Sequence, residues 1–519
     1  MSESKLKSIG ERAMVSESYD WQRLQNGSDI RGVAMEGVPG EAVNLTPEVA
    51  YRLGRAFVSW LATSTGKAST DLVVSVGRDS RLSGPALQDG LASGMRAMGA
   101  NVLDFAIAST PAMFVSTVNP GYRCDGAIML TASHLPFNRN GLKFFTAQGG
   151  LNKPDITEIL RLASENVFKY VSHKGELVEK DFISVYADGL VQQIRKEVND
   201  SQQYEQPLAG LHIVVDAGNG AGGFYASKVL KPLGADTSGS QFLEPDGHFP
   251  NHIPNPENAE AMAAICNAVL ENKADFGIIF DTDVDRSAAV DAKGNELNRN
   301  KLIALISAVV LREHPGSTIV TDSITSDGLT EFITGLGGTH HRFKRGYKNV
   351  INESVRLNET GEESWLAIET SGHGAMKENY FLDDGAYLVS KLLVELARAK
   401  QTGKALTDLI ADLREPAESE EYRLKILADD FKSHGERVIQ MLEDFVAQQA
   451  DWALVPNNYE GVRVACEQGW FLLRLSLHDP VLPLNIESDV TGGVEQIKNR
   501  LIDFFKTVDL LDTSALTNR

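Results

Sequence analysis

Short apolar runs alternate with amphipathic stretches through most of this chain, and this order restricts the fold more than any other feature of the sequence. Residues 72–84 are typical of a buried strand followed by a loop, residues 85–100 of a helix, and residues 101–110 of a second strand. A strand, a helix and a further strand in this order indicate a parallel sheet covered by helices. We therefore expect α/β organisation.

The segment ahead of this unit carries a helix start. Thr46 is a favourable N-cap, Pro47 suits the first helical position, and the residues that follow carry an apolar stripe with helical spacing. Arg31 precedes this segment, in what we interpret as a loop flanked by glycine. A surface ion pair and a functional contact explain such an arginine equally well.

The chain is too long for a single hydrophobic core. With 519 residues, a prior of about 150 residues per domain predicts three or four domains. The pattern changes towards the end, where a helix at residues 429–447 is followed by adjacent strands that meet at Gln468 and Gly469, and then by another helix. Adjacent strands with flanking helices indicate an antiparallel α+β domain.

Charge and hydropathy limit the partners and the location. The chain carries 50 Lys and Arg against 70 Asp and Glu, a net charge of -20 that is spread along the sequence and argues against nucleic acid or an anionic membrane surface. No apolar run reaches the roughly 18 residues of a membrane span, and residues 1–20 lack the apolar core of a secretory signal. Cys124, Cys266 and Cys466 lie far apart, as expected of reduced thiols. We expect a soluble cytoplasmic protein.

A candidate nucleophile follows a buried strand. Residues 125–130 form an apolar run of strand length, and Ser133 comes shortly after it. Pro136 and the pair Asn140 and Gly141 predict turns there, so we expect the serine to present its hydroxyl outward. A serine in such a turn more often caps local backbone than takes part in catalysis. A second loop of this chain makes the catalytic role the better explanation.

Three carboxylates follow a second buried strand. Asp281, Asp283 and Asp285 alternate after an apolar run and are followed by Arg286. Three like charges in five positions repel one another, and a hard divalent cation would remove that cost. An EF-hand loop is excluded because its glycine and glutamate positions hold Arg286 and Ala292 here.

Mg²⁺ fits this loop better than Ca²⁺ does. Magnesium usually keeps open coordination positions and binds partly through substrate phosphates. Three protein carboxylates with room for a phosphate oxygen would meet that need. The two loops together therefore predict phosphoryl transfer to and from Ser133.

With these motifs the chain resembles the α-D-phosphohexomutases, the family of phosphoglucomutases and phosphomannomutases. In that family the first loop reads T-A-S-H-N-P with a downstream N-G-x-K, its serine carries a phosphate, and the metal loop reads D-G-D-x-D-R. The resemblance runs over nearly the whole chain, with Leu135 in place of the asparagine and Thr282 in place of the glycine.

The resemblance implies four domains around a central cleft, with three similar mixed α/β domains and a C-terminal antiparallel α+β domain. The expected bounds are a flexible N-terminus at residues 1–20, a phosphoserine-loop domain at 21–203, a metal-loop domain at 204–313, a sugar-binding-loop domain at 314–413 and a phosphate-binding domain at 414–519.

The family's functional residues carry over to matching positions of this sequence. The resemblance implies a phosphorylated Ser133, with Lys143 or His373 as the base for the sugar hydroxyl. The full implied set comprises the catalytic residues Ser133, His134, Lys143, Arg31, Arg286 and His373, the metal ligands Ser133, Asp281, Asp283 and Asp285, and the substrate-binding residues Lys348, Glu369, Ser371, Arg474, Ser476 and His478.

Two stretches of the predicted third domain support this assignment. Residues 340–348 concentrate cations, and although charge clusters are usually solvated, the family has a basic loop beside the sugar phosphate at this point. Residues 366–381 end an apolar strand in Glu369 and Ser371, and a carboxylate with a hydroxyl suits vicinal sugar hydroxyls. Ile368 replaces the first glycine of the family's sugar loop.

A glycine-rich turn at residues 218–223 is the main competing motif. It has the G-x-G-x-x-G spacing of a dinucleotide-binding loop between a predicted strand and a predicted helix. The family has a similar turn without a dinucleotide, so we assign these glycines to structure. This turn is the only motif that would favour a nicotinamide oxidoreductase.

The last predicted domain departs from the family. The family's phosphate loop reads R-x-S-G-T-E-P, whereas this chain has Leu477 and His478 in place of the glycine and the threonine. A later arginine is also absent, since Leu484 or Asn485 stands at its position. His478 would compensate only when it is protonated, which would make phosphate affinity depend on pH.

The sequence therefore predicts a phosphohexomutase that interconverts hexose 1-phosphate and hexose 6-phosphate, of glucose, mannose or both, through a phosphoserine and a 1,6-bisphosphate. Mg²⁺ and a hexose 1,6-bisphosphate activator are the implied cofactors, and small sugar phosphates are the expected partners of a monomer or dimer. Two alternatives stay open: a catalytically impaired regulatory homologue that binds sugar phosphates, and a phosphoglucosamine mutase. No motif in the sequence distinguishes the hexoses.

Overall fold

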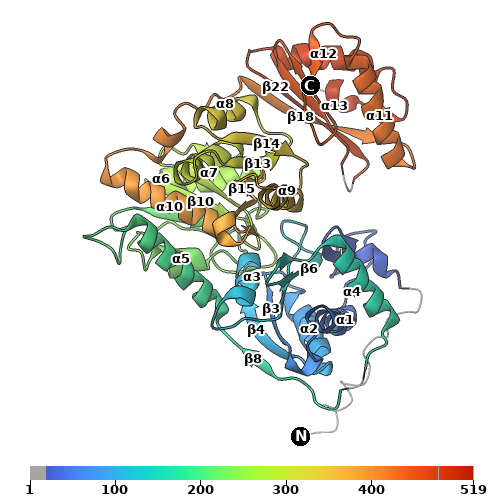
Figure 1. Ribbon diagram of the computed structural model, residues 1–519, viewed down its shortest axis with the longest axis vertical. Helices are drawn as coiled ribbons and strands as arrows, with labels where there is room; N and C mark the ends of the chain where they lie inside the picture. The colour runs from blue at the N-terminus through green and yellow to red at the C-terminus, as the bar shows by residue number, and fades with distance from the viewer. Residues whose placement is uncertain (1–18, 170, 477–478, 518–519) are drawn as a thin grey trace. The chain divides into compact units, whose positions relative to one another are not determined.

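The computed structural model describes residues 19–169, 171–476 and 479–517 (Figure 1). Its contacts divide the chain into two compact units. The first unit holds Met1–Asn298, Ser371–Gly374 and Leu382–Leu406, and the second holds Arg299–Thr370, Ala375–Phe381 and Thr407–Arg519. Of the predicted N-terminal segment, residues 1–18 lie outside the described residues. The predicted domain bounds stay predictions.

The first unit opens with an eight-stranded mixed sheet. Its order is β1-β2-β6-β5-β3-β4-β8, with β7 paired to β6. The neighbours β5, β3, β4 and β8 run parallel, whereas β6 is antiparallel to β5 and to β2. The strands are β1 (Gln25–Asn26), β2 (Asp29–Val33), β3 (Val73–Arg78), β4 (Asn101–Ile107), β5 (Gly126–Leu130), β6 (Arg139–Thr146), β7 (Gly149–Gly150) and β8 (Leu177–Glu179).

Helices cover both faces of this sheet. Ile128 and Leu130 of β5 share one core with α1, α2 and α4, whereas Met113 of α3 lies against Gly77 on the other face. The predicted N-cap is confirmed, because the Thr46 hydroxyl accepts a hydrogen bond from the Val49 N–H at 3.2 Å. The helices are η2 (Trp21–Leu24), α1 (Pro47–Thr65), η3 (Ser69–Asp71), α2 (Gly84–Ala97), α3 (Thr110–Val118), α4 (Lys153–Glu165) and α5 (Phe182–Val198).

A second, four-stranded sheet completes the first unit. Its order is β12-β11-β10-β9; β9 and β10 are parallel, and β10 forms an antiparallel hairpin with β11. The loop of this hairpin carries the three alternating aspartates. The elements are β9 (Ile213–Asp216), the π-helical η4 (Tyr225–Leu230), α6 (Ala259–Asn272), β10 (Phe276–Phe280), β11 (Ser287–Asp291), β12 (Glu296–Leu297) and α10 (Gly385–Gln401).

The second unit begins with another α/β layer. Strand β13 lies between β14 and β15 and is parallel to both. The elements of this region are α7 (Arg299–Glu313), β13 (Thr318–Asp322), α8 (Asp327–Gly335), β14 (Thr339–Phe343), α9 (Tyr347–Glu359) and β15 (Ser364–Ile368). The short elements β16 (Gly374–Met376), η5 (Lys377–Asn379), β17 (Leu382–Asp383) and η6 (Leu406–Ile410) follow along the chain. Of these, β17, Gly374 of β16 and Leu406 of η6 belong to the first unit.

The C-terminal part is an antiparallel sheet of order β19-β20-β21-β22-β18-β23, as predicted. Its strands and helices share one hydrophobic core. The elements are β18 (Glu418–Ile426), α11 (Phe431–Val446), β19 (Trp452–Leu454), β20 (Val462–Cys466), β21 (Gly469–Leu473), β22 (Val481–Ser488), α12 (Gly493–Phe505), β23 (Leu511–Asp512) and α13 (Ser514–Thr517). The three sheets with their helices and this antiparallel sheet confirm the predicted fold class.

Two local predictions were wrong. Arg31 lies within β2 rather than in a loop, and Asn140 and Gly141 lie within β6 rather than in a turn. Both errors come from reading glycine as a turn signal. A Cβ at Gly141 would lie 2.3 Å from the Ile30 carbonyl oxygen, so this glycine permits close strand contact.

Two other observations concern the whole described chain. No described helix is both long and apolar enough to cross a membrane. The three cysteines are free, which agrees with the prediction of reduced thiols; Cys124 is buried, and Cys266 and Cys466 are half-buried.

Helices α1 and α2 meet backbone to backbone. A Cβ at Gly90 would lie 2.3 Å from the Pro47 carbonyl oxygen, and a Cβ at Gly94 would lie 2.0 Å from the Tyr51 carbonyl oxygen. Neither atom belongs to a flexible side chain, so an added methyl group would push the helices apart. In α5, by contrast, a Cβ at Gly189 would meet nothing within 4 Å.

We predict opposite effects for Gly94→Ala and Gly189→Ala. The first should lower the free energy of unfolding of its domain by about 1–3 kcal/mol through overpacking, and the second should raise it by roughly 0.4–1 kcal/mol by restricting the unfolded chain. Urea unfolding followed by circular dichroism would measure both. Equal stability of the two variants would contradict the close helix contact.

Candidate active site

Ser133 lies in a strained turn directly after β5. Its φ is 50°, a left-handed conformation that few residues other than glycine adopt. The Ser133 N–H donates to the Thr131 hydroxyl at 2.9 Å. The side chain is buried, with only 4% of the residue exposed. The prediction of an outward hydroxyl was therefore wrong: the turn directs it into the protein, towards the aspartate loop.

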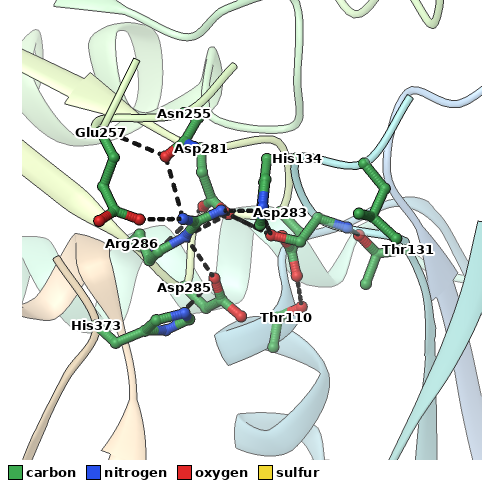
Figure 2. Close-up of polar contacts among 12 residues, drawn as sticks. Thr110, Thr131, His134, Asn255, Glu257, Asp281, Asp283, Asp285, Arg286 and His373 are labelled. Atoms are coloured by element: carbon green, nitrogen blue, oxygen red, sulfur yellow. Dashed lines mark hydrogen bonds and ion pairs between the residues drawn. The ribbon is translucent and has the colours of Figure 1, made fainter. Parts of the chain in front are cut away.

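The hydroxyl of Ser133 lies between a carboxylate and a guanidinium of the aspartate loop. It donates to Asp281 Oδ2 at 2.9 Å and accepts from Arg286 Nη2 at 2.9 Å. The same Arg286 nitrogen donates to His134 Nδ1 at 2.6 Å. Figure 2 shows Arg286 among these partners. The structure thus brings together the two loops that the sequence singled out separately.

The loop between β10 and β11 is held by three distant backbone segments. The consecutive carbonyls of residues 282–284 accept from the N–H groups of Ala221, Thr110 and Gly385, at 2.8, 2.8 and 3.1 Å respectively. Val284 has a φ of 68°, which is unusual for a β-branched residue and persists only where surrounding contacts enforce it. The three hydrogen bonds supply such enforcement.

Glycines allow these segments to approach. A Cβ at Gly220 would lie 2.6 Å from the Thr282 carbonyl oxygen, and a Cβ at Gly372 would lie 2.6 Å from the Ser287 carbonyl oxygen. Gly220 belongs to the glycine-rich turn that also matched a dinucleotide motif. Its packing against the aspartate loop supports the structural assignment of that turn.

The three aspartates are buried beside two cations. Asp281, Asp283 and Asp285 are at most 1% exposed, and one carboxylate oxygen of each lies within 4.8 Å of the others. Lys143 Nζ lies 3.0 Å from Asp283 Oδ2 and also pairs with Asp285, while Arg286 Nη2 lies 3.2 Å from Asp281 Oδ2. These two cations offset the repulsion that the sequence predicted.

The donor set fits a hard divalent cation. Asp283 Oδ1 and Asp285 Oδ1 are buried and have no hydrogen-bond partner in the described parts of the chain. Buried carboxylate oxygens without a donor are costly, and oxygen ligands of this kind are those that magnesium and calcium prefer. Asp283 is oriented by Thr110, whose hydroxyl donates to Asp283 Oδ2 at 2.5 Å.

The carboxylates of this cluster differ in acidity. Burial raises the pKa of Asp281 well above its ordinary value, and the carboxylates of Asp285 and Asp283 raise it further. Burial also opposes ionisation of Asp285, but the cations of Lys143 and His373 outweigh it and hold the pKa of Asp285 below its ordinary value. A further cation near Asp281 would therefore favour its ionised form.

The two predicted histidines carry different charges. Burial, reinforced by the neighbouring Arg286, lowers the pKa of His134 to about 3, so this ring is neutral and can accept the Arg286 hydrogen bond. Burial alone would also lower the pKa of His373, but Asp383 and Asp285 raise it to about 9. His373 Nδ1 lies 2.5 Å from Asp383 Oδ2. His373 is therefore protonated at neutral pH and pairs with both carboxylates.

Arg31 contacts the serine loop from the neighbouring strand. Its guanidinium lies 3.4 Å from Asp29 and donates to the Ala132 carbonyl at 3.5 Å. Of the two explanations that the sequence left open, the ion pair with Asp29 is present, although it is partly buried, and the functional contact stays a prediction. The position beside Ala132 brings Arg31 to the same loop as Ser133.

Other predicted residues belong to the second unit. Glu369 Oε1 accepts from the Gly346 N–H at 2.6 Å, and Lys348 lies in the first turn of α9. Arg474 is 8% exposed, and its Nε is buried without a hydrogen-bond partner among the described residues. The Ser476 hydroxyl accepts from the Asp479 N–H at 3.3 Å. His478 lies outside the described residues, and Ser371 belongs to the first unit.

Sequence reasoning missed several residues that orient the site. Thr110 and Asp383 contact predicted site residues directly, and Glu460 Oε2 accepts from the Arg345 N–H at 3.1 Å in the second unit. Asp383 stands beside Asp384, the N-cap of α10, and this pair of aspartates is a signal that could have pointed to it. Thr110 is buried at a helix start and gave no such signal.

Comparisons with known proteins agree on one family. Family models described as phosphoglucomutase/phosphomannomutase, alpha/beta/alpha domains I, II and III match residues 22–170, 184–294 and 298–416. A phosphoglucomutase of Neisseria gonorrhoeae is 31% identical over 474 residues, which are 91% of this chain and 94% of that protein. A phosphomannomutase/phosphoglucomutase of Pseudomonas putida is 32% identical, covering 92% and 95%.

Solved structures give the same result. A phosphoglucomutase/phosphomannomutase family protein of Burkholderia thailandensis has a TM-score of 0.75 at 28% identity, covering 95% of this chain and 98% of that one. A phosphoglucomutase from Paramecium has a TM-score of 0.70 at 16% identity, covering 96% and 95%. The second likeness supports the fold.

We predict that Lys143→Met raises the affinity of the aspartate cluster for Mg²⁺. The substitution removes a cation that pairs with two of the carboxylates, so the cluster should bind the metal roughly tenfold more tightly. Isothermal titration calorimetry with Mg²⁺ would measure this. Lys67→Met is the matched control, because Lys67 pairs with Asp125 and its side chain is 52% exposed. Unchanged or weaker binding by folded Lys143→Met would contradict the prediction.

Proposed function

Because the chain belongs to the phosphoglucomutase/phosphomannomutase family and is therefore a phosphohexomutase, we propose that it interconverts hexose 1-phosphates and hexose 6-phosphates through a phosphoserine at Ser133. One observation carries this proposal: the Ser133 hydroxyl lies 2.9 Å from both Asp281 Oδ2 and Arg286 Nη2. A nucleophile bound to a loop of three buried carboxylates and an arginine suits phosphoryl transfer, in which positioning and charge neutralisation supply most of the catalysis.

The proposed reaction has two transfers. Phosphorylated Ser133 donates its phosphoryl group to the free hydroxyl of a hexose phosphate, which loses its proton as the new P–O bond forms and the bond to Ser133 Oγ breaks. The resulting 1,6-bisphosphate then returns its other phosphate to Ser133 and leaves the isomeric product. A hexose 1,6-bisphosphate would recharge an unphosphorylated serine, which accounts for the expected activator.

The residues around Ser133 have distinct proposed roles. Arg286 neutralises charge on the transferring group, since its guanidinium already donates to the serine oxygen. Asp281, Asp283 and Asp285 would hold Mg²⁺ together with a phosphoserine oxygen. Bound there, Mg²⁺ would supply positive charge to the oxygens of the transferring phosphoryl group. Neutral His134 accepts from Arg286 and so helps to orient the guanidinium.

Lys143 and His373 are the candidates for moving the sugar proton. Both contact Asp285, Lys143 through an ion pair and His373 through Nδ1 at 3.8 Å. With a pKa of about 9, His373 holds a proton at neutral pH and suits the role of acid. Lys143 is then the candidate base, and it must first give up the proton that its ammonium carries while it pairs with Asp283 and Asp285.

Several residues of the second unit have proposed roles in binding the sugar and its phosphate. Arg474 is a buried arginine whose Nε lacks a described hydrogen-bond partner, as expected of a residue that awaits a phosphate. Ser476 and Lys348 would add a hydroxyl and a cation. Glu369, held by the Gly346 N–H, would bind a sugar hydroxyl, and Ser371 of the first unit stays a predicted substrate-binding residue. A role for His478 stays a prediction.

The proposal also covers the substrates, the partners, the location and the oligomeric state. Glucose and mannose phosphates are the proposed substrates, without nucleic acid or membrane partners, in the cytoplasm and as a monomer or dimer. The alternatives, a regulatory homologue and a phosphoglucosamine mutase, are separated by two measurements. A regulatory homologue would bind sugar phosphates without phosphorylating Ser133, and a phosphoglucosamine mutase would turn over glucosamine phosphate in preference.

Ser133→Ala should abolish both phosphorylation and turnover. The variant lacks the oxygen that carries the phosphoryl group, so kcat should fall at least about 10³-fold. Peptide mass spectrometry after incubation with glucose 1,6-bisphosphate and Mg²⁺, alongside coupled assays with glucose 1-phosphate and mannose 1-phosphate, would measure this. The exposed Ser227 provides a control variant, Ser227→Ala. Full activity of Ser133→Ala, or full activity of the wild type in excess chelator, would contradict the proposed mechanism.

Arg474→Met should weaken substrate binding more than turnover. Loss of a charge-assisted hydrogen bond to phosphate should raise KM for the hexose phosphate roughly tenfold or more, while Ser133 should still be phosphorylated. Steady-state kinetics would measure the change, with Arg423→Met as the control because the Arg423 side chain is 53% exposed on β18. A KM within twofold of the wild type would remove Arg474 from the proposed phosphate site.

A further inference from the structure

One buried arginine, outside every predicted site set, lies at the centre of the serine loop. Arg81 follows β3 and is 0% exposed. Its Nη2 donates to the carbonyls of Ser133 and Leu135 at 2.5 and 2.6 Å, and its Nη1 donates to the carbonyls of Pro136 and Arg139 at 2.8 and 3.0 Å. The loop therefore wraps around a single guanidinium.

The hydrogen bonds of Arg81 explain how the strained backbone of Ser133 is stabilised. The residue has a φ of 50°, and such a conformation persists at a residue with a side chain only where the surroundings enforce it. Four carbonyl oxygens that converge on one point repel one another unless donors lie between them. Arg81 supplies those donors, and one of them binds the carbonyl of Ser133 itself, so the orientation of that peptide depends on the guanidinium.

The sheet in turn holds Arg81 in place. Its Nε lies 3.3 Å from Asp79 Oδ2, and the Asp79 side chain is 0% exposed. The Arg81 N–H donates to Asp79 Oδ1 at 2.9 Å, and the Asp79 N–H donates to the Leu130 carbonyl at 3.0 Å, at the end of β5. The ring of Phe249 lies 5.4 Å from the guanidinium. These contacts from several sides fix the position of the Arg81 side chain.

We propose that Arg81 is a positioning residue that sets the backbone of the loop at residues 133–139 and thereby aims the Ser133 hydroxyl at Asp281 and Arg286. It acts through the loop and touches no reacting atom. The consequence for catalysis rests on the proposed role of Ser133 as phosphoryl carrier, whereas the hold on the loop does not. Lysine cannot replace Arg81, because an ammonium lacks the planar fork that reaches separate carbonyls.

Arg81→Lys separates positioning from binding. We expect kcat to fall about 100-fold, since small misplacement of a reacting group has effects of this size, and KM for the hexose phosphate to change less than about threefold. The rate of Ser133 phosphorylation by glucose 1,6-bisphosphate should fall by the same factor as kcat. Hydrogen–deuterium exchange in the unphosphorylated protein should speed up in peptides covering residues 130–141.

Two further variants make the result specific. Arg96→Lys is the matched control, because Arg96 Nε also donates to a backbone carbonyl, that of Gly175, at 2.8 Å; it should leave phosphorylation and exchange in the loop unchanged. In Arg81→Ala, added methylguanidinium should restore part of the Ser133 phosphorylation rate and slow loop exchange, whereas equal methylammonium should not. Loss through general instability would not respond to the shape of the cation.

The outcomes distinguish this inference from the proposed function. Phosphorylation rate and loop exchange at wild-type values in Arg81→Lys would overturn the inference whether or not the proposed function holds. If wild-type Ser133 takes up no phosphate while Arg81→Lys still speeds exchange in residues 130–141, the proposed function fails and the hold of Arg81 on the loop is supported. Equal rescue by methylammonium would also overturn the inference, since it would show that charge alone suffices.

Discussion

The burial of three carboxylates within one short loop is the constraint on which the rest of the site depends. Asp281, Asp283 and Asp285 are almost fully buried, and like charges this close oppose one another's ionisation unless cations offset them. Lys143 and Arg286 provide that offset within the first unit. Arg286 also donates to Ser133 Oγ. The arginine that offsets the carboxylate charge therefore also holds the serine hydroxyl beside the carboxylates.

Hydrogen bonds to backbone carbonyls give this loop and the serine loop their shape. The carbonyls of residues 282–284 are held by three segments far apart in the sequence, and the carbonyls of the serine loop converge on Arg81. Each loop contains a residue with a side chain at positive φ, Val284 and Ser133. Such strained backbone conformations persist only where surrounding contacts enforce them. The contacts around these two loops therefore leave each loop little conformational freedom.

Most of the fold and the centre of the site could be predicted from the sequence, because their signals are local. Apolar runs of strand length ended shortly before Ser133 and directly before Asp281, and Thr46 with Pro47 marked a helix start. The errors involved contacts between distant segments. Gly141 resembled a turn residue but serves close strand contact, and neither Arg81 nor Thr110 carries a motif that reveals its partners, which come from loops more than 50 residues away.

The central claim is that Ser133 gives its phosphate to a hexose phosphate, and a pulse–chase measurement tests it most directly. The protein would be labelled on Ser133 with radioactive phosphate from a hexose 1,6-bisphosphate, freed of excess label, and mixed with unlabelled glucose 1-phosphate in a rapid-quench apparatus. The proposed mechanism predicts that the label leaves the protein and is recovered in hexose bisphosphate and hexose phosphate no more slowly than turnover. Label that stays on Ser133 while product forms would contradict it.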